Sequence, residues 1–239
     1  MKSAVRTTQA GERPLSDLAL VTAPAAPERR FGADLVMLSD PSGARAETIR
    51  GLRTHVTAQH LAFGRRALVI CAPTAECGCT YVAANLAVAF AQGGLNTLLM
   101  DANLRAPGVD AIIPPATPEA GLRQCLRGAE LNLGANLEQN VLPNLSILYT
   151  GGAAQDALEL LGSDRFEGVM AACMRDFDIT IVDAPPANIG ADALRISTVT
   201  GYSLIVARGD HSFIKDVQTL HSELTVDGVR VVGTVLVEA

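Results

Sequence analysis

The sequence predicts an α/β fold built on a doubly wound, mostly parallel sheet. Short and unbroken apolar runs alternate with helical patterns from about residue 44 to the end of the chain. Parallel strands that are buried on both faces show such runs, and the helices between them cover the two faces of the sheet. Hydrophobic residues make up 49% of the 239 residues and charged residues 18%. This composition supplies enough apolar side chains for one core.

The strands and helices are expected in alternation, with no internal repeat. Apolar runs bounded by polar or glycine-containing segments predict the strands, at residues 66–71, 97–101, 145–149, 179–183, 203–207 and 229–237. Longer segments with a helical distribution of apolar residues predict the helices, at residues 44–63, 80–92, 121–127, 157–161, 163–175, 191–197 and 212–226.

The first part of the chain differs from the rest in composition. Residues 1–42 are rich in Ala, Pro, Thr and Arg and show no sustained period. We expect them to form a flexible arm, with the apolar patch at residues 31–38 as a docking peptide. Residues 43–239 are then predicted to form one domain.

The charge balance and the apolar segments exclude several classes of protein. The formal net charge is −6 with a pI near 5.2, which disfavours a nucleic-acid binder. Aromatic residues are 4% of the chain and Trp is absent, so base-stacking platforms are not expected. Apolar stretches such as residues 82–91 are shorter than a membrane span, and the first residues lack the apolar region of a signal peptide. We expect a cytoplasmic protein that reaches the inner face of the membrane through a partner.

The loop after the first predicted strand has the features of a phosphate cradle. It runs Cys-Ala-Pro-Thr-Ala-Glu-Cys-Gly-Cys-Thr over residues 71–80 and leads directly into a helix, whose free N-terminal amides attract anions. Asp101 and Asp183 end two other predicted strands and are expected to face this loop. With the hydroxyl of Thr80 they could hold Mg²⁺ and its waters. The structural alternative is that the two carboxylates cap nearby loop amides.

These features resemble the cytoplasmic P-loop domain of bacterial tyrosine kinases (BY-kinases), which partner polysaccharide co-polymerases in capsule and exopolysaccharide export. The resemblance covers residue 44 to the C-terminus. It rests on Glu47-x-x-Arg50-x-x-Arg53, the loop at 73–80, Asp101-x-Asn103-x-Arg105-x-Pro107, Glu159-Leu-Leu161, Val182-Asp-Ala-Pro-Pro186 and Val232-Gly-Thr-Val-Leu236.

The resemblance implies a P-loop NTPase fold of the deviant-Walker type that partitioning ATPases share. It also implies that a nucleotide, if one binds, contacts Gly78, Cys79, Thr80 and Tyr81, and that Mg²⁺ lies near Thr80, Asp101 and Asp183. No other cofactor is expected.

The chain departs from the family pattern at its most charged positions. The family loop ends Gly-x-Gly-Lys-[Ser/Thr], whereas here Glu76 stands at the first glycine and Cys79 at the lysine. Asn103 replaces the second acidic residue of the family's Asp-x-Asp. Loss of one preorganised charge commonly costs ~3–4 kcal/mol of transition-state stabilisation. We therefore expect no intact catalytic set and regard Cys79, Asp101 and Asn103 as vestigial.

Glu76 is predicted to oppose a nucleotide in two ways. A carboxylate ~5 Å from a phosphate charge at an effective dielectric constant of ~20 is repelled by ~3 kcal/mol. If the backbone there requires positive φ, a residue other than glycine adds ~1–2 kcal/mol. The chain has two lysines, Lys2 and Lys215, and neither is near the loop in sequence. The sequence therefore predicts weak nucleotide binding and negligible turnover.

The five cysteines, at positions 71, 77, 79, 125 and 173, are expected to be reduced thiols. Their spacing is a poor match to a structural zinc site. Cys79 lies at a predicted helix N-terminus, where the pKa of a thiol can be lowered. This position suggests a redox-sensitive loop.

The predicted helix at 44–63 offers a surface for self-association. Glu47, Arg50 and Arg53 are spaced along one flank of the helix. An isolated set of this kind is a solvated surface with one weak ion pair of ~0.2–0.5 kcal/mol. In the resembling family, however, the motif lies at a protomer interface. The resemblance thus implies a homo-oligomer.

The preferred function is that of a pseudokinase scaffold or regulator of exopolysaccharide synthesis and export. By resemblance, its partner is the cytoplasmic tail of a membrane polysaccharide co-polymerase. The chain has tyrosines at 81, 149 and 202, so the family's C-terminal tyrosine cluster is not expected.

Two alternatives remain open. The first is an active ATPase or tyrosine autokinase in which an arginine, Arg105 or one from a neighbouring protomer, replaces the lysine. The second is a partitioning-type positioning factor, which the lack of a basic or amphipathic C-terminal helix disfavours.

Overall fold

One seven-stranded sheet organises residues 31–128 and 132–238, the part of the chain that the computed structural model describes. The strand order is β3-β4-β2-β5-β1-β6-β7, and all neighbours are parallel except β3, which is antiparallel to β4. The predicted fold class is therefore confirmed. The strands are β1 (Ala67–Cys71), β2 (Thr97–Asp101), β3 (Glu138–Leu142), β4 (Leu145–Leu148), β5 (Ile179–Asp183), β6 (Tyr202–Arg208) and β7 (Arg230–Val237).

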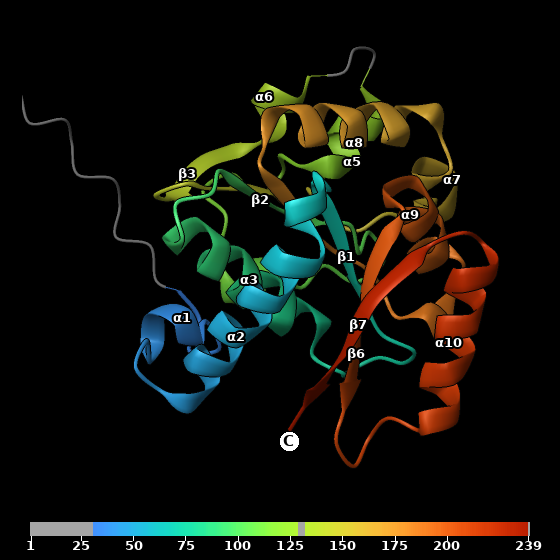
Figure 1. The fold of residues 1–239 in the computed structure, drawn as a ribbon. Helices are drawn as coiled ribbons and strands as arrows, with labels where there is room; N and C mark the ends of the chain where they lie inside the picture. Colours follow the sequence, from blue (N-terminus) through green and yellow to red (C-terminus); the bar gives the residue numbers. More distant parts are fainter. Residues whose placement is uncertain (1–30, 129–131, 239) are drawn as a thin grey trace, which may run out of the picture.

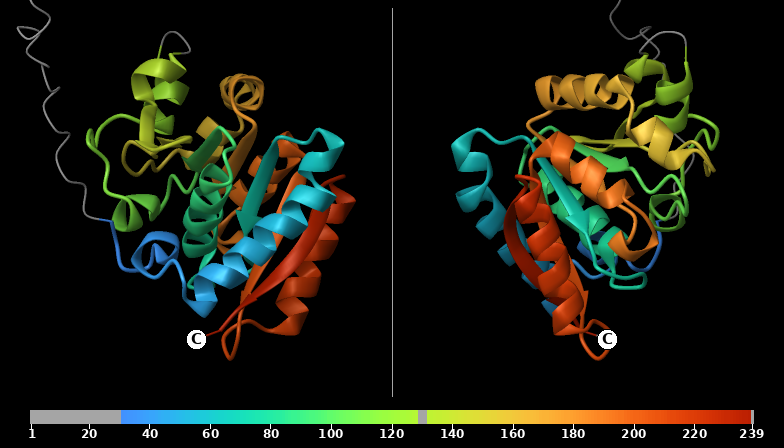
Figure 2. Two further views of the ribbon diagram at one scale, coloured as in Figure 1. Left: turned by 60° about the vertical axis from the view of Figure 1, so that its left-hand side comes forward. Right: turned by 90° about the vertical axis from the view of Figure 1, so that its right-hand side faces the viewer.

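Helices cover both faces of the sheet (Figures 1 and 2). One layer contains α1 (Val36–Ser39), α2 (Ala44–Gln59), α3 (Cys79–Gln92) and α4 (Val109–Ile112). The other contains α5 (Leu122–Arg127), α7 (Ala157–Leu161), α8 (Asp164–Asp176), α9 (Asp192–Thr200) and α10 (Ile214–Val226). The remaining elements are α6 (Leu133–Asn136) and the 3₁₀ turns η2 (Leu61–Phe63) and η3 (Ala187–Ile189). No helix in the described ranges is long and apolar enough to cross a membrane.

Helix α3 is the centre of the first layer. Its ten residues from Val82 to Ala91 are all buried, as expected for a helix that is apolar on every side. Alanines dominate this stretch, so the helix can lie close to the sheet, while Leu86 and Phe90 fill the core. This packing fixes the N-terminus of α3 at the carboxyl edge of the strands.

The strand register brings the predicted acidic residues side by side. Asp101 at the end of β2 is paired in register with Asp183 at the end of β5. Asp183 is in turn paired with Ile70 of β1, one residue before the loop that leads to α3. The expected convergence of these strand ends is thus confirmed.

The sequence located the central elements to within a few residues and missed the peripheral ones. Strand β3, with the sequence Glu-Gln-Asn-Val-Leu, was not predicted because it is polar and lies at the sheet edge. The single-turn helices α1, α4 and α6 were also missed. Elements this short carry too few residues to show a period.

The predicted boundary of the flexible arm is wrong for residues 31–42, while residues 1–30 lie outside the described part of the chain. Leu35 and Met37 are buried in the core. Asn85 of α3 accepts a hydrogen bond from the Met37 amide (3.1 Å) and donates one to the Asp34 carbonyl (2.9 Å). The apolar patch at 31–38 therefore docks on its own domain. The sequence could not show this, because one buried asparagine in a distant helix holds the segment.

His60 is a buried titratable group at the opposite end of the sheet. It caps α2, is fully inaccessible to solvent, and packs edge-to-face on Tyr202 with ring centroids 4.9 Å apart. Burial lowers its pKa to about 4; a backbone hydrogen bond at Ala67 opposes the shift, and the charge of Arg65 adds to it. The folded protein therefore holds His60 neutral.

We expect His60 to make the protein acid-sensitive. Below pH 6.5 the unfolded chain binds a proton at this residue, whereas the folded chain does so only near pH 4. The free energy of unfolding therefore falls as the pH drops through this window, by up to about 3 kcal/mol. Urea unfolding at several pH values should show a smaller loss for His60→Phe than for the wild type. Substitution of the exposed His55 is the control, and identical profiles for His60→Phe and the wild type would contradict the prediction.

Candidate nucleotide site

The loop between β1 and α3 carries two residues in the left-handed region. Gly78 has φ 91° and immediately precedes the helix, and Glu76 has φ 61°. The other residues with positive φ that are not glycine are Asn140, Asn144 and Asp210, whose side chains tolerate this conformation. Glu76 thus has the unfavourable backbone that the sequence suggested. Its side chain is exposed, so water screens its repulsion of a phosphate to about 1 kcal/mol.

The connection between β6 and α10 braces this loop. Arg208 donates from Nη1 to the Glu76 carbonyl (3.2 Å), and His211 Nε2 lies 2.9 Å from the Ala75 carbonyl oxygen. Ser212 Oγ lies 3.2 Å from the sulfur of buried Cys77. These contacts could not be predicted from the sequence, because the contacting residues are more than 130 positions apart. The one available signal was that β6 ends at the same edge of the sheet.

Thr80 and Asp183 form a direct contact beside the loop. Thr80 Oγ1 donates to Asp183 Oδ2 at 2.6 Å. Asp183 is buried, and its Oδ1 accepts no hydrogen bond from the described residues. A buried carboxylate oxygen without a partner is unfavourable unless a cation or a water reaches it. This oxygen is therefore the atom of Asp183 that is left for a cation or a water.

Asp101 acts as a cap for the chain that follows it. Oδ1 accepts from the Asn103 amide (3.0 Å), and Oδ2 accepts from the amides of Gly108 and Val109 (both 3.1 Å). The structural alternative offered for this carboxylate is thus the one observed. The cap also requires Gly108, because a Cβ there would lie 3.0 Å from Thr80 Oγ1.

Both carboxyl groups have a raised proton affinity, mainly because they are buried. Burial raises the pKa of Asp101 to about 6, although its three backbone hydrogen bonds favour the charged form. Burial, followed by the charge of Asp101, raises the pKa of Asp183 well above its usual range. Neighbouring buried carboxylates of this kind bind a proton or a cation between them. Thr80, Asp101 and Asp183 therefore remain suited to Mg²⁺, which would balance their charge and orient phosphate oxygens.

The thiol of Cys79 is not activated. Burial raises its pKa well above the usual value, and the charge of Asp183 adds to this shift. The prediction of a lowered pKa at the helix N-terminus is therefore wrong, because desolvation and the neighbouring carboxylate outweigh the helix dipole. The described residues contain no group of three or more His, Cys, Asp or Glu side chains that could hold a metal ion, and the five cysteines are free thiols.

Arg105 is committed to a buried ion pair. Its Nε donates to Asp192 Oδ2 at 2.5 Å and its Nη2 to Oδ1 at 3.3 Å. Asp192 is 1% exposed, so moving the arginine away would leave a buried charge without a partner, at about 3–5 kcal/mol. Asn103 is equally occupied, since its Oδ1 accepts from the Ala106 amide (3.1 Å). Both residues shape the loop after β2.

The three residues of the predicted self-association motif have different environments. Arg50 contacts Glu47 Oε2 (3.2 Å) and donates to the Pro41 carbonyl (2.7 Å) near the surface. Arg53 instead turns toward α3 and donates to the Ala89 carbonyl (3.0 Å) near the end of that helix. Glu47 and Arg50 are therefore available to a partner, whereas Arg53 supports the fold.

The chain is similar in sequence to several tyrosine-protein kinases. It is 29% identical over 191 residues to Ptk of Acinetobacter johnsonii, covering 79% of this chain and 26% of that protein. It is 28% identical over 222 residues to the putative kinase EpsB of Ralstonia solanacearum, covering 93% and 29%. The chain thus spans little more than a quarter of the length of these relatives. No family model matches the sequence.

The chain is also similar in structure to a solved tyrosine kinase domain. The kinase domain of the Escherichia coli tyrosine kinase Etk superposes with a TM-score of 0.81 at 26% identity, covering 86% of this chain and 80% of that one. The chain is thus similar in sequence and in fold to bacterial tyrosine kinases. The chimerical protein CapA2B2 also superposes, with a TM-score of 0.77 at 25% identity over 87% of this chain and 90% of that one. At 19% identity, the Mg-ADP complex of MinD from Pyrococcus horikoshii shares the P-loop NTPase fold.

We predict that glycine is favoured over alanine at position 76. Because φ is 61° there, Glu76→Gly should be about 1 kcal/mol more stable than Glu76→Ala. Neighbouring Ala75 has no positive φ, so Ala75→Gly should instead lower stability by about 0.5–1 kcal/mol. Urea unfolding measures all three. Equal stability of the two variants at position 76 would contradict the strain argument.

Proposed function

We propose that this BY-kinase homologue is a pseudokinase that acts as a scaffold or regulator of exopolysaccharide synthesis and export. The observation that carries the proposal is Cys79, a neutral and partly buried thiol at the loop position where the family pattern has lysine. By the same resemblance, the partner would be the cytoplasmic tail of a membrane co-polymerase, which would hold the protein at the inner face of the membrane.

The surroundings of the loop support this proposal. Glu76 adds backbone strain and negative charge, and the connection after β6 ties the loop to the protein by three side-chain contacts. Arg105, one candidate for a substitute cation, is held by Asp192. A frame of this kind retains the shape of the domain without the fixed charge that phosphoryl transfer requires.

The alternative of an active kinase can be tested at Arg208. Its guanidinium lies beside the loop, on the Glu76 carbonyl, and is the cation that a phosphate in the loop would most readily recruit. Substitution of Arg208 would then abolish any activity that the native protein has, whereas a pseudokinase has none to lose.

Calorimetric titration with Mg·ATP and Mg·ADP is the direct test. We expect no measurable heat from the native protein and measurable binding by the double variant Glu76→Gly/Cys79→Lys, because that variant restores both the backbone freedom and the phosphate-binding charge. The matched control is Glu76→Gly/Cys79→Met, which has a long side chain without charge and should not bind.

Tight binding by the native protein, accompanied by phosphate transfer to its own tyrosines, would overturn the pseudokinase proposal. The Arg208→Gln variant would then show whether this arginine is the replacement for lysine. Binding without transfer would instead define a nucleotide-sensing scaffold.

Self-association through α2 is part of the same proposal. Glu47 has 76% of its side chain exposed and Arg50 has 31%. Arg50→Glu should abolish the α2 contact and reduce the size of the assembly in sedimentation velocity, because it replaces attraction across that contact by repulsion. Arg175→Glu on α8 of the opposite layer makes the same change in charge and should leave the profile unaltered. An unaltered profile for Arg50→Glu would remove α2 from the interface.

A further inference from the structure

The sheet ends on a long strand whose outer edge is open. Strand β7 is the last in the strand order, and it pairs with β6 on one side only. Among the described residues, its backbone hydrogen bonds run to β6 and to the turns that flank β6. An unpaired edge of eight residues presents a row of free amides and carbonyls to any strand that approaches it.

This edge has little protection against pairing. The seven residues from Val231 to Val237 contain no charge and no proline, which are two of the features that block an edge strand. Leu236 is 67% exposed. A register shift relative to β6 interrupts the strand near Val232, and the five residues from Gly233 to Val237 that follow form a regular template.

The edge also borders a groove that a second strand could fill. A cavity of about 220 Å³ lies between α2 and β7. Leu52 and Val56 line it from the helix, and Gly233 and Val235 line it from the strand. A strand added to an open edge commonly places alternate side chains in a groove of this kind, under a neighbouring helix.

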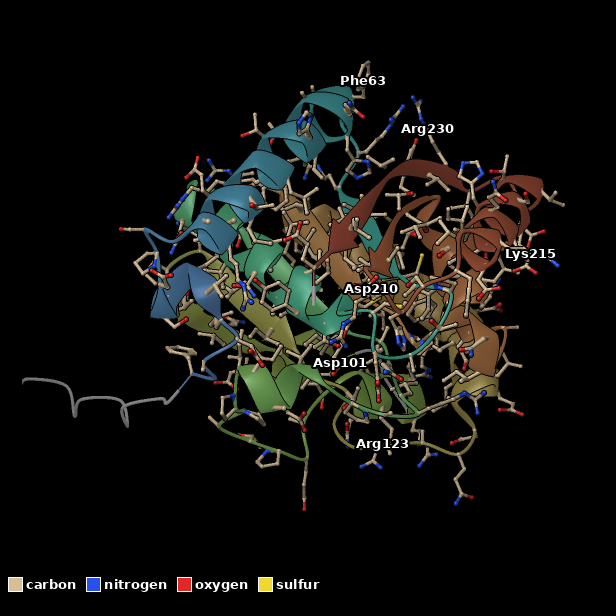
Figure 3. All side chains as sticks on the ribbon, turned by 90° about the horizontal axis from the view of Figure 1, so that it is seen from below. Phe63, Asp101, Arg123, Asp210, Lys215 and Arg230 are labelled. Atoms are coloured by element: carbon tan, nitrogen blue, oxygen red, sulfur yellow. The ribbon has the colours of Figure 1, made fainter. Side chains whose placement is uncertain are left out.

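The charges at the two ends of β7 identify the occupant. Arg230 begins the strand and Glu238 follows it directly; both are exposed, and neither forms an ion pair among the described residues. Figure 3 shows Arg230 extending from the rim of the molecule. If two copies of β7 pair in antiparallel fashion, each positive end meets the negative end of the other copy. A parallel pair would bring like charges together.

We propose that the free edge of β7 is a self-association surface on which a second copy of this chain adds its own β7 antiparallel, related by a two-fold axis. The interface is isologous, because the same strand lies on both sides. Pairing continues the sheet across two molecules, and the side chains of the second β7 enter the groove beside α2. This surface is distinct from the Glu47 and Arg50 surface, and it does not depend on whether the loop binds a nucleotide.

A charge-swap experiment tests the proposal with the full chain. In sedimentation velocity over a range of concentrations, Arg230→Glu and Glu238→Arg should each raise the dissociation constant of the β7 contact by about tenfold, because each creates two like-charge contacts per dimer. The double variant Arg230→Glu/Glu238→Arg should restore association, since it exchanges the two signs. High salt should weaken the wild-type contact and that of the double variant alike.

Two controls separate this effect from changes in net charge or folding. Lys215→Glu on α10, which also extends into solvent (Figure 3), changes the net charge as Arg230→Glu does and should leave association unaltered. Leu236→Lys adds a protective charge at an exposed edge position and should abolish the contact while circular dichroism stays native. Arg50→Glu as a background removes the contribution of α2.

The proposal is overturned if the Arg50→Glu protein is monomeric at every concentration, because β7 then forms no contact by itself. It is also overturned if the single reversals have no effect, or if the double variant associates no better than they do. In those cases the open edge would serve a different extended peptide or no partner.

Discussion

Two carboxylates at adjacent strand ends are the constraint on which the rest of this site depends. Asp101 and Asp183 are paired in register and buried, so the folded chain must satisfy both in a medium that disfavours their charge. Asp101 does this by organising the segment after β2 through three backbone amides. Asp183 does it with Thr80, and thereby fixes the first turn of α3. The shape of the candidate nucleotide site therefore follows from the need to stabilise two acidic groups.

The backbone path of the site and the charges of its side chains depend on different physical requirements. The path depends on packing, since α3 is buried along its length and Gly108 allows a close approach to Thr80. A charge at position 79 would contribute to phosphoryl transfer but is not needed for the fold. Cysteine there is small, neutral and partly buried, so the loop keeps its path without lysine. The packing of the fold therefore does not depend on the charge that the proposed function assigns to this position.

Two surfaces of the domain, on helix α2 and at the edge of β7, lie close to each other. Helix α2 exposes Glu47 and Arg50 on one side, and turns Arg53 inward to hold the end of α3. The open edge of β7 lies across a groove from the same helix. The connection after β6 braces the loop between β1 and α3 from the side on which β7 ends, and a Cβ at Gly78 would lie 3.7 Å from the Val237 side chain. The end of β7 and the loop between β1 and α3 are thus neighbours in the structure.

Local sequence patterns alone specify the sheet, its central helices and the position of the loop between β1 and α3. Apolar runs and helical periods are local properties, and each buried element had enough residues to show them. The polar edge strand β3 and the docking of Leu35 and Met37 were decided by tertiary contacts, because a weak local pattern gains stability only from its neighbours. The same holds for the raised pKa of Cys79, the pairing of Arg105 with Asp192 and the brace from Arg208. Each depends on burial or on a partner far away in the chain, and neither property is encoded in local spacing.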